Sequence, residues 1–191
     1  MPTSTLDTEA STTLQAALHY AEPGWPVLPG AIWKDGHFAN PADELPVTSP
    51  CLHPIEAATT DAELVRAWWS APGLHAPDVF TVTGPELGAF AVAEPLVMAL
   101  ADDPWFSKLP TPVLAFPNMP LAYFLVRPPV PSMLMSHEAR GVEARVPLPL
   151  PPSGLETTPV LWLVTPAQAG HHLMPADALV DLIQSYERKS A

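Results

Sequence analysis

The sequence contains one cysteine, few basic residues and no long hydrophobic run. Cys51 alone cannot form an intramolecular disulfide, and it cannot by itself hold a structural zinc ion, whose sites take about four ligands. The longest apolar stretch, residues 88–101, is interrupted by Glu94 and Pro95, whereas a membrane-spanning helix needs about 20 mostly apolar residues. The sequence therefore predicts neither a disulfide-stabilised fold nor a membrane protein.

Basic residues are scarce, with 8 Lys and Arg against 20 Asp and Glu and a net charge of −12. Proteins that bind DNA tightly neutralise several phosphates with clustered basic side chains, so tight binding of nucleic acid is not expected. The N-terminus has no basic segment followed by an apolar one, which argues against a secretory signal. We therefore expect a cytoplasmic protein.

Proline and apolar residues are abundant instead. The 191 residues include 27 prolines spread along the chain, and 48% of the residues are hydrophobic, which is enough for a core. Such spacing of prolines favours short strands and many ordered loops. We expect residues 1–10 to form a disordered arm and residues 11–191 to form a single domain.

Hydrophobic periodicity predicts four helices. They cover residues 11–22, a segment starting at Thr60, residues 95–101 and a segment starting at Pro175. The second helix opens with TDAE at residues 60–63, which fits a capping box in which the Thr60 hydroxyl accepts a hydrogen bond from the Glu63 amide. That helix is expected to bury Leu64, Ala67 and Trp68.

Strand-like runs are short and lie between turn residues. They cover residues 25–29, 79–82, 89–92, 113–116, 122–126 and 160–164, and residues 142–146 are the better candidate in the proline-rich stretch 128–159. Residues 30–58 show no periodicity and are expected to form a long loop. Because strands and helices do not alternate strictly, we predict an α+β fold with a mixed β-sheet flanked by helices.

Several short segments follow one another in an order typical of a known family. They are AEPGWPVLP at residues 21–29, CLHP at 51–54, ATTD at 58–61, AWW at 67–69 and VFTVTG at 79–84. In this order they resemble the N-terminal domain of bifunctional DNA primase/polymerases, the Prim-Pol family, from about residue 14 to about residue 165. The resemblance implies a fold related to the archaeo-eukaryotic primase core and template-directed addition of nucleotides to DNA.

The resemblance also implies where the catalytic residues of such an enzyme would lie. It places an Asp-x-Asp metal pair at Ala93 and Pro95, and a histidine that contacts nucleotide phosphates at Leu121. Catalysis with two metal ions needs carboxylates that hold cations about 3.5–4 Å apart, and these three side chains carry no ligand atom. A third motif resembles GVEAR at residues 141–145, followed by LPPSG at 150–154, and leaves Glu143 as a residual carboxylate. We interpret the chain as a degenerate, inactive member with no catalytic residue and no bound metal.

The remaining role of such a chain is binding or regulation, and a protein partner is expected. Arg127, Arg140 and Arg145 are the nearest approach to a basic cluster and are candidates for binding a nucleotide, unless they pair with Glu138 and Glu143. No cofactor is expected. Two alternatives stay open. One is an active polymerase that holds Mg²⁺ or Mn²⁺ through Glu143, and the other is an unrelated protein-interaction module.

Two further clusters have two interpretations each. Cys51 and His53 are either the remainder of a zinc loop or an ordinary thiol and imidazole, because two ligands leave a tetrahedral site half empty. Trp68 and Trp69 are either a platform on which nucleic-acid bases stack or part of the core. The sequence favours the structural interpretation in both cases.

Overall fold

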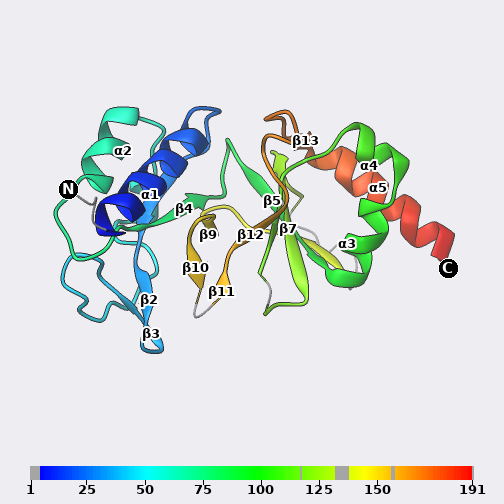
Figure 1. Cartoon of the computed structure of the whole chain (residues 1–191). Helices are drawn as coiled ribbons and strands as arrows, with labels where there is room; N and C mark the ends of the chain where they lie inside the picture. Colours follow the sequence, from blue (N-terminus) through cyan, green and yellow to red (C-terminus); the bar gives the residue numbers. More distant parts are fainter. Residues whose placement is uncertain (1–4, 117, 132–137, 156–157, 191) are drawn as a thin grey trace. The chain divides into compact units, whose positions relative to one another are not determined.

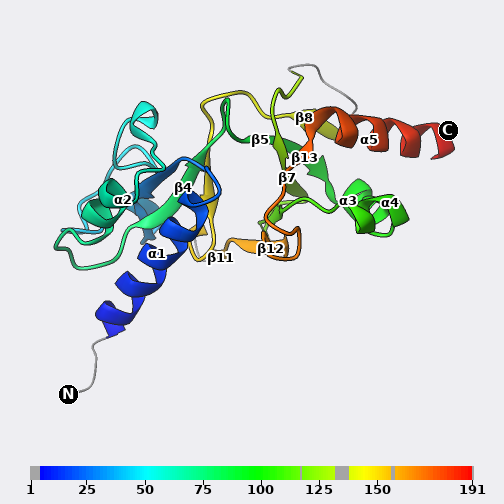
Figure 2. The same ribbon diagram turned by 90° about the horizontal axis from the view of Figure 1, so that it is seen from above.

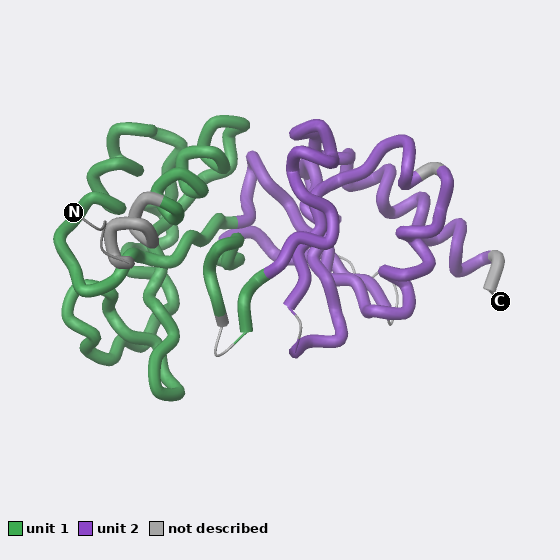
Figure 3. The backbone as a smooth tube through the Cα atoms, in the orientation of Figure 1, with its two compact units in different colours: residues 1–82, 147–160 green, residues 83–146, 161–191 purple. Residues whose placement is uncertain are grey.

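The computed structural model describes residues 5–116, 118–131, 138–155 and 158–190. The chain divides into two compact units, which Figure 3 shows in different colours. Unit 1 comprises Met1–Val82 and Pro147–Val160, and unit 2 comprises Thr83–Val146 and Leu161–Ala191. The sequence predicted one domain over residues 11–191, whereas here each unit has its own sheet and its own helices (Figure 1).

Unit 1 is built on a three-stranded antiparallel sheet in the order β1 (Val27–Gly30), β4 (Asp78–Val82), β9 (Pro147–Leu150). The other elements of unit 1 are α1 (Thr5–Ala21), β2 (Ile32–Lys34), β3 (His37–Ala39), η1 (Ile55–Ala57), α2 (Ala62–Trp69), β10 (Gly154–Leu155) and β11 (Thr158–Pro159). Because α1 begins at Thr5, most of the predicted arm over residues 1–10 belongs to a helix.

A hairpin of β2 and β3 lies within the segment that the sequence predicted to be a loop over residues 30–58. Lys34 pairs with His37, and the two residues between them, Asp35 and Gly36, have φ angles of 48° and 85°. Positive φ at both central positions is typical of the type I′ turn, whose twist matches that of the flanking strands. The loop prediction is therefore wrong for residues 32–39.

Helix α2 starts one residue later than the capping box suggested and buries a different face. The carboxylate of Asp61, not the Thr60 hydroxyl, accepts hydrogen bonds from the amides of Glu63 (2.8 Å) and Leu64 (3.4 Å). Val65 and Trp69 are buried, while Leu64 is 40% exposed. The spacing is four residues in both pairs, 64 with 68 and 65 with 69. Spacing alone therefore could not show which pair faces inward.

Replacing Asp61 with alanine is expected to lower the free energy of unfolding by about 1 kcal/mol, because two amides of the first turn of α2 lose their acceptor. Thr60→Ala is the matched control and is expected to change it by less than about 0.5 kcal/mol. Urea unfolding followed by circular dichroism measures both. An equal loss in the two variants would contradict the assignment of Asp61 as the cap.

Unit 2 is built on an antiparallel sheet in the order β12-β6-β7-β5-β8, to which β13 adds a parallel pairing with β7. Its strands are β5 (Gly88–Ala93), β6 (Val113–Ala115), β7 (Leu121–Arg127), β8 (Ala139–Gly141), β12 (Leu161–Val164) and β13 (Met174–Pro175). Its helices are α3 (Glu94–Ala101), α4 (Pro104–Lys108) and α5 (Ala176–Ser190). The predicted α+β fold with a mixed sheet and flanking helices is confirmed.

Two strand predictions in this part of the chain are wrong. Residues 142–146 form no strand, because β8 ends at Gly141 and the following residues form a turn before β9. The segment 160–164 was expected to be a buried strand, but β12 lies at the edge of the sheet, with Leu161 45% and Leu163 53% exposed. The pairing of β12 with β6 is also irregular between Trp162 and Val164.

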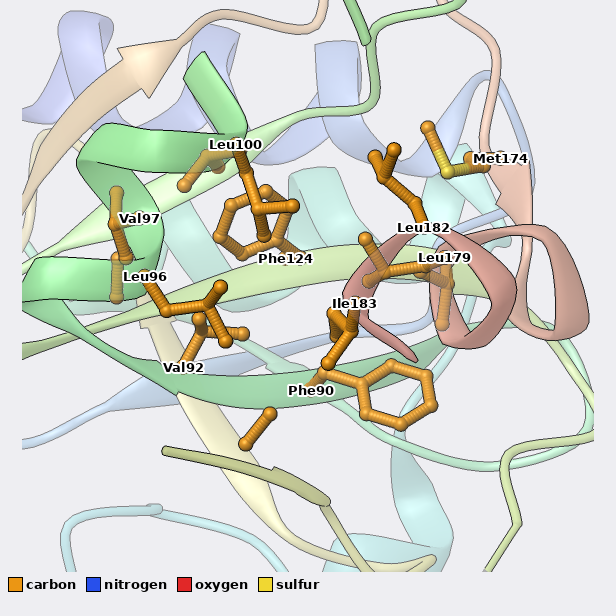
Figure 4. Packing of buried hydrophobic residues seen from close by; sticks show 14 of the residues in the cluster. Phe90, Val92, Leu96, Val97, Leu100, Phe124, Met174, Leu179, Leu182 and Ile183 are labelled. Carbon is orange, nitrogen blue, oxygen red and sulfur yellow. The ribbon is translucent and has the colours of Figure 1, made fainter. Parts of the chain in front are cut away.

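The core of unit 2 lies between the sheet and its helices, which Figures 1 and 2 show on one side of β5 and β7. Alternate residues of the two central strands, Phe90 with Val92 and Phe124 with Val126, are buried in this core. Figure 4 shows Phe90, Val92 and Phe124 packed against residues of α3 and α5, which are Leu96, Val97, Leu100, Leu179, Leu182 and Ile183. The core fixes the orientation of β5 and β7, whose ends position the candidate site.

None of the helices in the described ranges is both long and apolar enough to cross a lipid bilayer.

Candidate functional site

The end of β5 brings together the three positions at which the resemblance places metal and phosphate ligands. In the antiparallel pairing of β5 with β7, Ala93 lies directly opposite Leu121. Pro95 follows in the first turn of α3. A backbone N–H at this position has no acceptor within the helix, so proline, which has no N–H, is tolerated there. Ala93, Pro95 and Leu121 thus lie at one end of the β5–β7 ladder.

The side chains at this end offer little to a cation. Alanine, proline and leucine provide no oxygen or nitrogen ligand. Glu94 begins α3, and its side chain is exposed; its backbone N–H donates a hydrogen bond to the carbonyl of Pro120 (3.0 Å). That bond ties α3 to the start of β7 and keeps Ala93 next to Leu121.

Glu138 is a residue of this site that the sequence analysis missed. The backbone N–H of Ala93 donates to the carbonyl of Glu138 (2.7 Å), and Val92 pairs with Ala139 in β8. Glu138 is therefore the carboxylate that β8 brings to the end of β5. A sequence signal did exist, because Glu-Ala-Arg occurs twice, at residues 138–140 and 143–145.

Glu143 lies toward the opposite end of β5. The N–H of Val142 donates to the carbonyl of Ala89, and the carbonyl of Glu143 accepts from the Thr83 hydroxyl (2.6 Å). Four residues of strand separate Ala89 from Ala93, which is about 13 Å at the usual rise. Glu143 and Ala93 thus do not belong to one metal site in this fold.

The three candidate arginines are distributed along the sheet of unit 2. Arg140 pairs with Ala91 in the middle of β5, whereas Arg127 ends β7 one residue beyond the Gly88–Val126 pair. Arg145 lies in a turn with a φ of 69°, and its N–H donates to the carbonyl of Thr83 (2.7 Å). All three are exposed. Arg127 thus lies near the start of β5 and Arg145 next to Thr83, which precedes β5, whereas Arg140 lies about 10 Å further along the strand.

The residues at the end of β5 do not fit a site for two metal ions. A pair of divalent cations requires several carboxylates that converge on one point, and here the carboxylates are Glu94 and Glu138. Within the described ranges, no three His, Cys, Asp or Glu side chains are grouped as metal ligands.

The LPPSG segment, which the sequence analysis joined to the third catalytic motif, has a structural role in unit 1. The buried hydroxyl of Ser153 accepts a hydrogen bond from the N–H of Val79 (2.6 Å) and donates one to its carbonyl (3.0 Å). Ser153 thereby fixes the turn after β9 to the first residues of β4. This part of the motif belongs to unit 1, whereas β5 belongs to unit 2.

Cys51 and His53 are placed for packing. Cys51 is buried with Leu28 and Phe80, and burial raises the pKa of its thiol to about 11, so the thiolate that metals bind is disfavoured. The His53 ring stacks on Trp68 with 4.9 Å between centroids. Trp69 is 3% exposed and donates from Nε1 to the carbonyl of Pro77 (3.1 Å). One tryptophan of the pair is therefore in the core and the other is covered by an imidazole.

The sequence of the chain matches the model of a known protein family. The family model for the N-terminal domain of bifunctional DNA primase/polymerases, Prim-Pol, matches residues 17–172. The chain therefore belongs to the Prim-Pol family, and the alternative of an unrelated interaction module is wrong. Comparison with curated proteins and with solved structures gives no match.

Proposed function

We propose that this chain is a Prim-Pol domain that has lost nucleotidyl transfer and acts by binding. The observation that carries the proposal is the pairing of Ala93 with Leu121 at the end of β5. This register supports the alignment on which the loss of ligands rests, because the three positions meet in space as the ligands of a metal and a phosphate would. Their side chains then leave two cations without the carboxylates that transfer requires.

A protein partner fits the composition better than nucleic acid does. The net charge of −12 repels phosphates, and Arg127, Arg140 and Arg145 are spread along β5 instead of converging on one point. A nucleotide remains the second candidate ligand, because Arg127 lies near the start of β5 and Arg145 lies next to Thr83, which precedes β5. Binding of nucleoside triphosphates in calorimetry at millimolar concentration tests this candidate, and a loss of binding in Arg145→Gln would support it.

Purified protein is expected to show no primer extension on a primed DNA template with deoxynucleotides and either Mg²⁺ or Mn²⁺. It is also expected to show no Mn²⁺ site tighter than millimolar by electron paramagnetic resonance, because the ligand positions hold alanine, proline and leucine. A stoichiometric Mn²⁺ site together with extension products would overturn the proposal.

Two matched variants identify the carboxylate responsible if the protein proves active. Loss of extension in Glu138→Gln would mean that the end of β5 is a working site with an unusual ligand set. Loss in Glu143→Gln instead would support an active polymerase that uses Glu143. The two residues lie in identical Glu-Ala-Arg tripeptides, so each variant is a control for the other.

A further inference from the structure

Unit 1 contains a cavity of about 490 Å³ whose wall includes Pro152 of the LPPSG segment but none of the positions Ala93, Pro95, Leu121 and Glu143. It lies between α1, β2, the start of β4 and the turn before β10. Its lining residues are Thr12, Thr13, Ile32, Trp33, Lys34, His75, Ala76, Asp78 and Pro152. The volume is in the usual range for sites that bind small molecules, about 300–1,000 Å³.

The Asp78 carboxyl in the wall of this cavity has no cationic partner. It accepts a backbone hydrogen bond from Gly154, but within the described ranges no Lys, Arg or His nitrogen lies within 4.0 Å of it. Burial raises its pKa from 3.8 to about 7, and the bond from Gly154 opposes this only in part. A carboxylate that is withdrawn from water without a counter-ion is a place where a bound cation gains energy.

The two basic residues in the wall do not make the cavity a site for anions. Lys34 Nζ lies 2.5 Å and His75 Nε2 lies 2.6 Å from the two carboxylate oxygens of Glu44. Both basic groups also hold the pKa of Glu44 below its ordinary value, Lys34 more than His75. The Glu44 carboxylate thus pairs with both side chains and offsets the charge of Lys34, whereas the charge of Asp78 has no such partner among the described residues.

Trp33 supplies an aromatic and apolar wall. Its ring packs edge to face against Phe38, with 4.9 Å between centroids and 84° between planes, which restricts the orientation of the indole. Aromatic rings attract cations to their faces, and Ile32 and Pro152 add apolar surface beside them. A ligand that carries one positive charge on an apolar body would match both the Asp78 carboxylate and the apolar surface around Trp33.

We propose that this cavity binds a small organic cation, a primary ammonium compound with an apolar body, through the Asp78 carboxylate and the Trp33 ring. The ammonium group donates hydrogen bonds to the carboxylate, and the body of the ligand packs on the indole. The site is independent of the end of β5, so it does not depend on whether the chain is catalytically active. A metal ion fits less well, because the described residues offer no group of three ligands here.

The experiment is a calorimetric titration of the whole protein at about pH 8.5, where Asp78 is ionised. Benzylamine, which is cationic at this pH, is the probe, and benzyl alcohol and benzoate are its neutral and anionic counterparts. We expect saturable binding of one benzylamine and none of the other two. Asp78→Asn is expected to weaken binding by about tenfold or more, and Trp33→Leu is expected to weaken it as well.

Asp35→Asn is the matched control, because it makes the same chemical change on an exposed residue next to β2 that does not line the cavity. It is expected to leave the affinity unchanged. Folding of each variant is checked by circular dichroism. The proposal is overturned if folded wild-type protein binds no benzylamine, if Asp78→Asn binds it as tightly, or if benzyl alcohol or benzoate binds equally well.

The pH dependence provides a second readout. Since only the ionised carboxyl binds the ligand, the affinity for benzylamine is expected to rise about tenfold per pH unit below about pH 7 and to level off above it. Among the described residues, Lys34 and His75 are the other charged or titratable groups that line the cavity, and Glu44 pairs with both, so the series is repeated with His75→Gln. Retention of the profile in that variant supports Asp78 as its source, and its loss contradicts the proposal.

Discussion

Replacing Asp78 with asparagine is expected to stabilise the protein at neutral and alkaline pH but not at about pH 4. Burial raises the pKa of this carboxyl from 3.8 to about 7, so the folded protein holds a proton that the unfolded chain releases between these values. The free energy of unfolding therefore falls as the pH rises from about 4 to about 7 and is level above that. Asparagine can still accept the hydrogen bond from Gly154, but it cannot ionise. The substitution therefore removes the fall in the free energy of unfolding between about pH 4 and about pH 7.

The difference between Asp78→Asn and the wild type is expected to grow to an upper value of about 4 kcal/mol above pH 7, since each pKa unit corresponds to about 1.4 kcal/mol. Urea unfolding at a series of pH values measures it. Tryptophan fluorescence is a suitable signal, because four of the six tryptophans lie in unit 1. Asp35→Asn serves as the control. A difference that does not change with pH would show that Asp78 ionises freely in the folded protein.

Truncation of Phe124 to alanine is expected to destabilise unit 2 by about 3–5 kcal/mol. This side chain is 1% exposed at the centre of β7, and its ring packs edge to face against Phe106 with 5.6 Å between centroids. The ring lies between the sheet and α3 (Figure 4), so the variant loses the burial of the ring and leaves a cavity there. Thermal unfolding followed by circular dichroism measures the effect.

Met98→Ala in α3 is the matched control, because its side chain is 62% exposed on a helix that packs against the same core. A change of less than about 0.5 kcal/mol is expected there. Similar losses in Phe124→Ala and Met98→Ala would mean that the core of unit 2 is not packed between β7 and α3 as described.

The sequence predicts the helices and strands of this fold well where apolar residues follow a clear pattern. The runs at residues 79–82, 89–92 and 122–126 lie within β4, β5 and β7, and α5 begins one residue after the predicted Pro175. It does not predict the three-residue strands of the β2–β3 hairpin. The type I′ signal of Asp35-Gly36 was in the sequence, but the strands on either side are too short to show an alternating pattern.

The positions of the candidate site stay a prediction from the sequence, and the carboxylate next to them could not be predicted. A match of short segments locates Ala93 and Leu121, since each lies next to a strand with a clear pattern. The choice between Glu138 and Glu143 depends on the register of β8 against β5, and two identical tripeptides cannot reveal it. The uncompensated charge of Asp78 could not be predicted from the sequence either, because the burial of this side chain depends on how β2, β4 and β10 pack together.

The path of the chain between the two units has a consequence for synthesis on the ribosome. Strand β9 completes the sheet of unit 1, and Ser153 bonds both backbone groups of Val79, yet these residues are made only after the whole of Thr83–Val146. A nascent chain that ends at Val82 therefore lacks the strand that pairs with the second edge of β4. Unit 1 begins to emerge first, but it cannot be completed until Val160 has been made, after most of unit 2. A fragment ending at Val82 would lack one strand of its sheet.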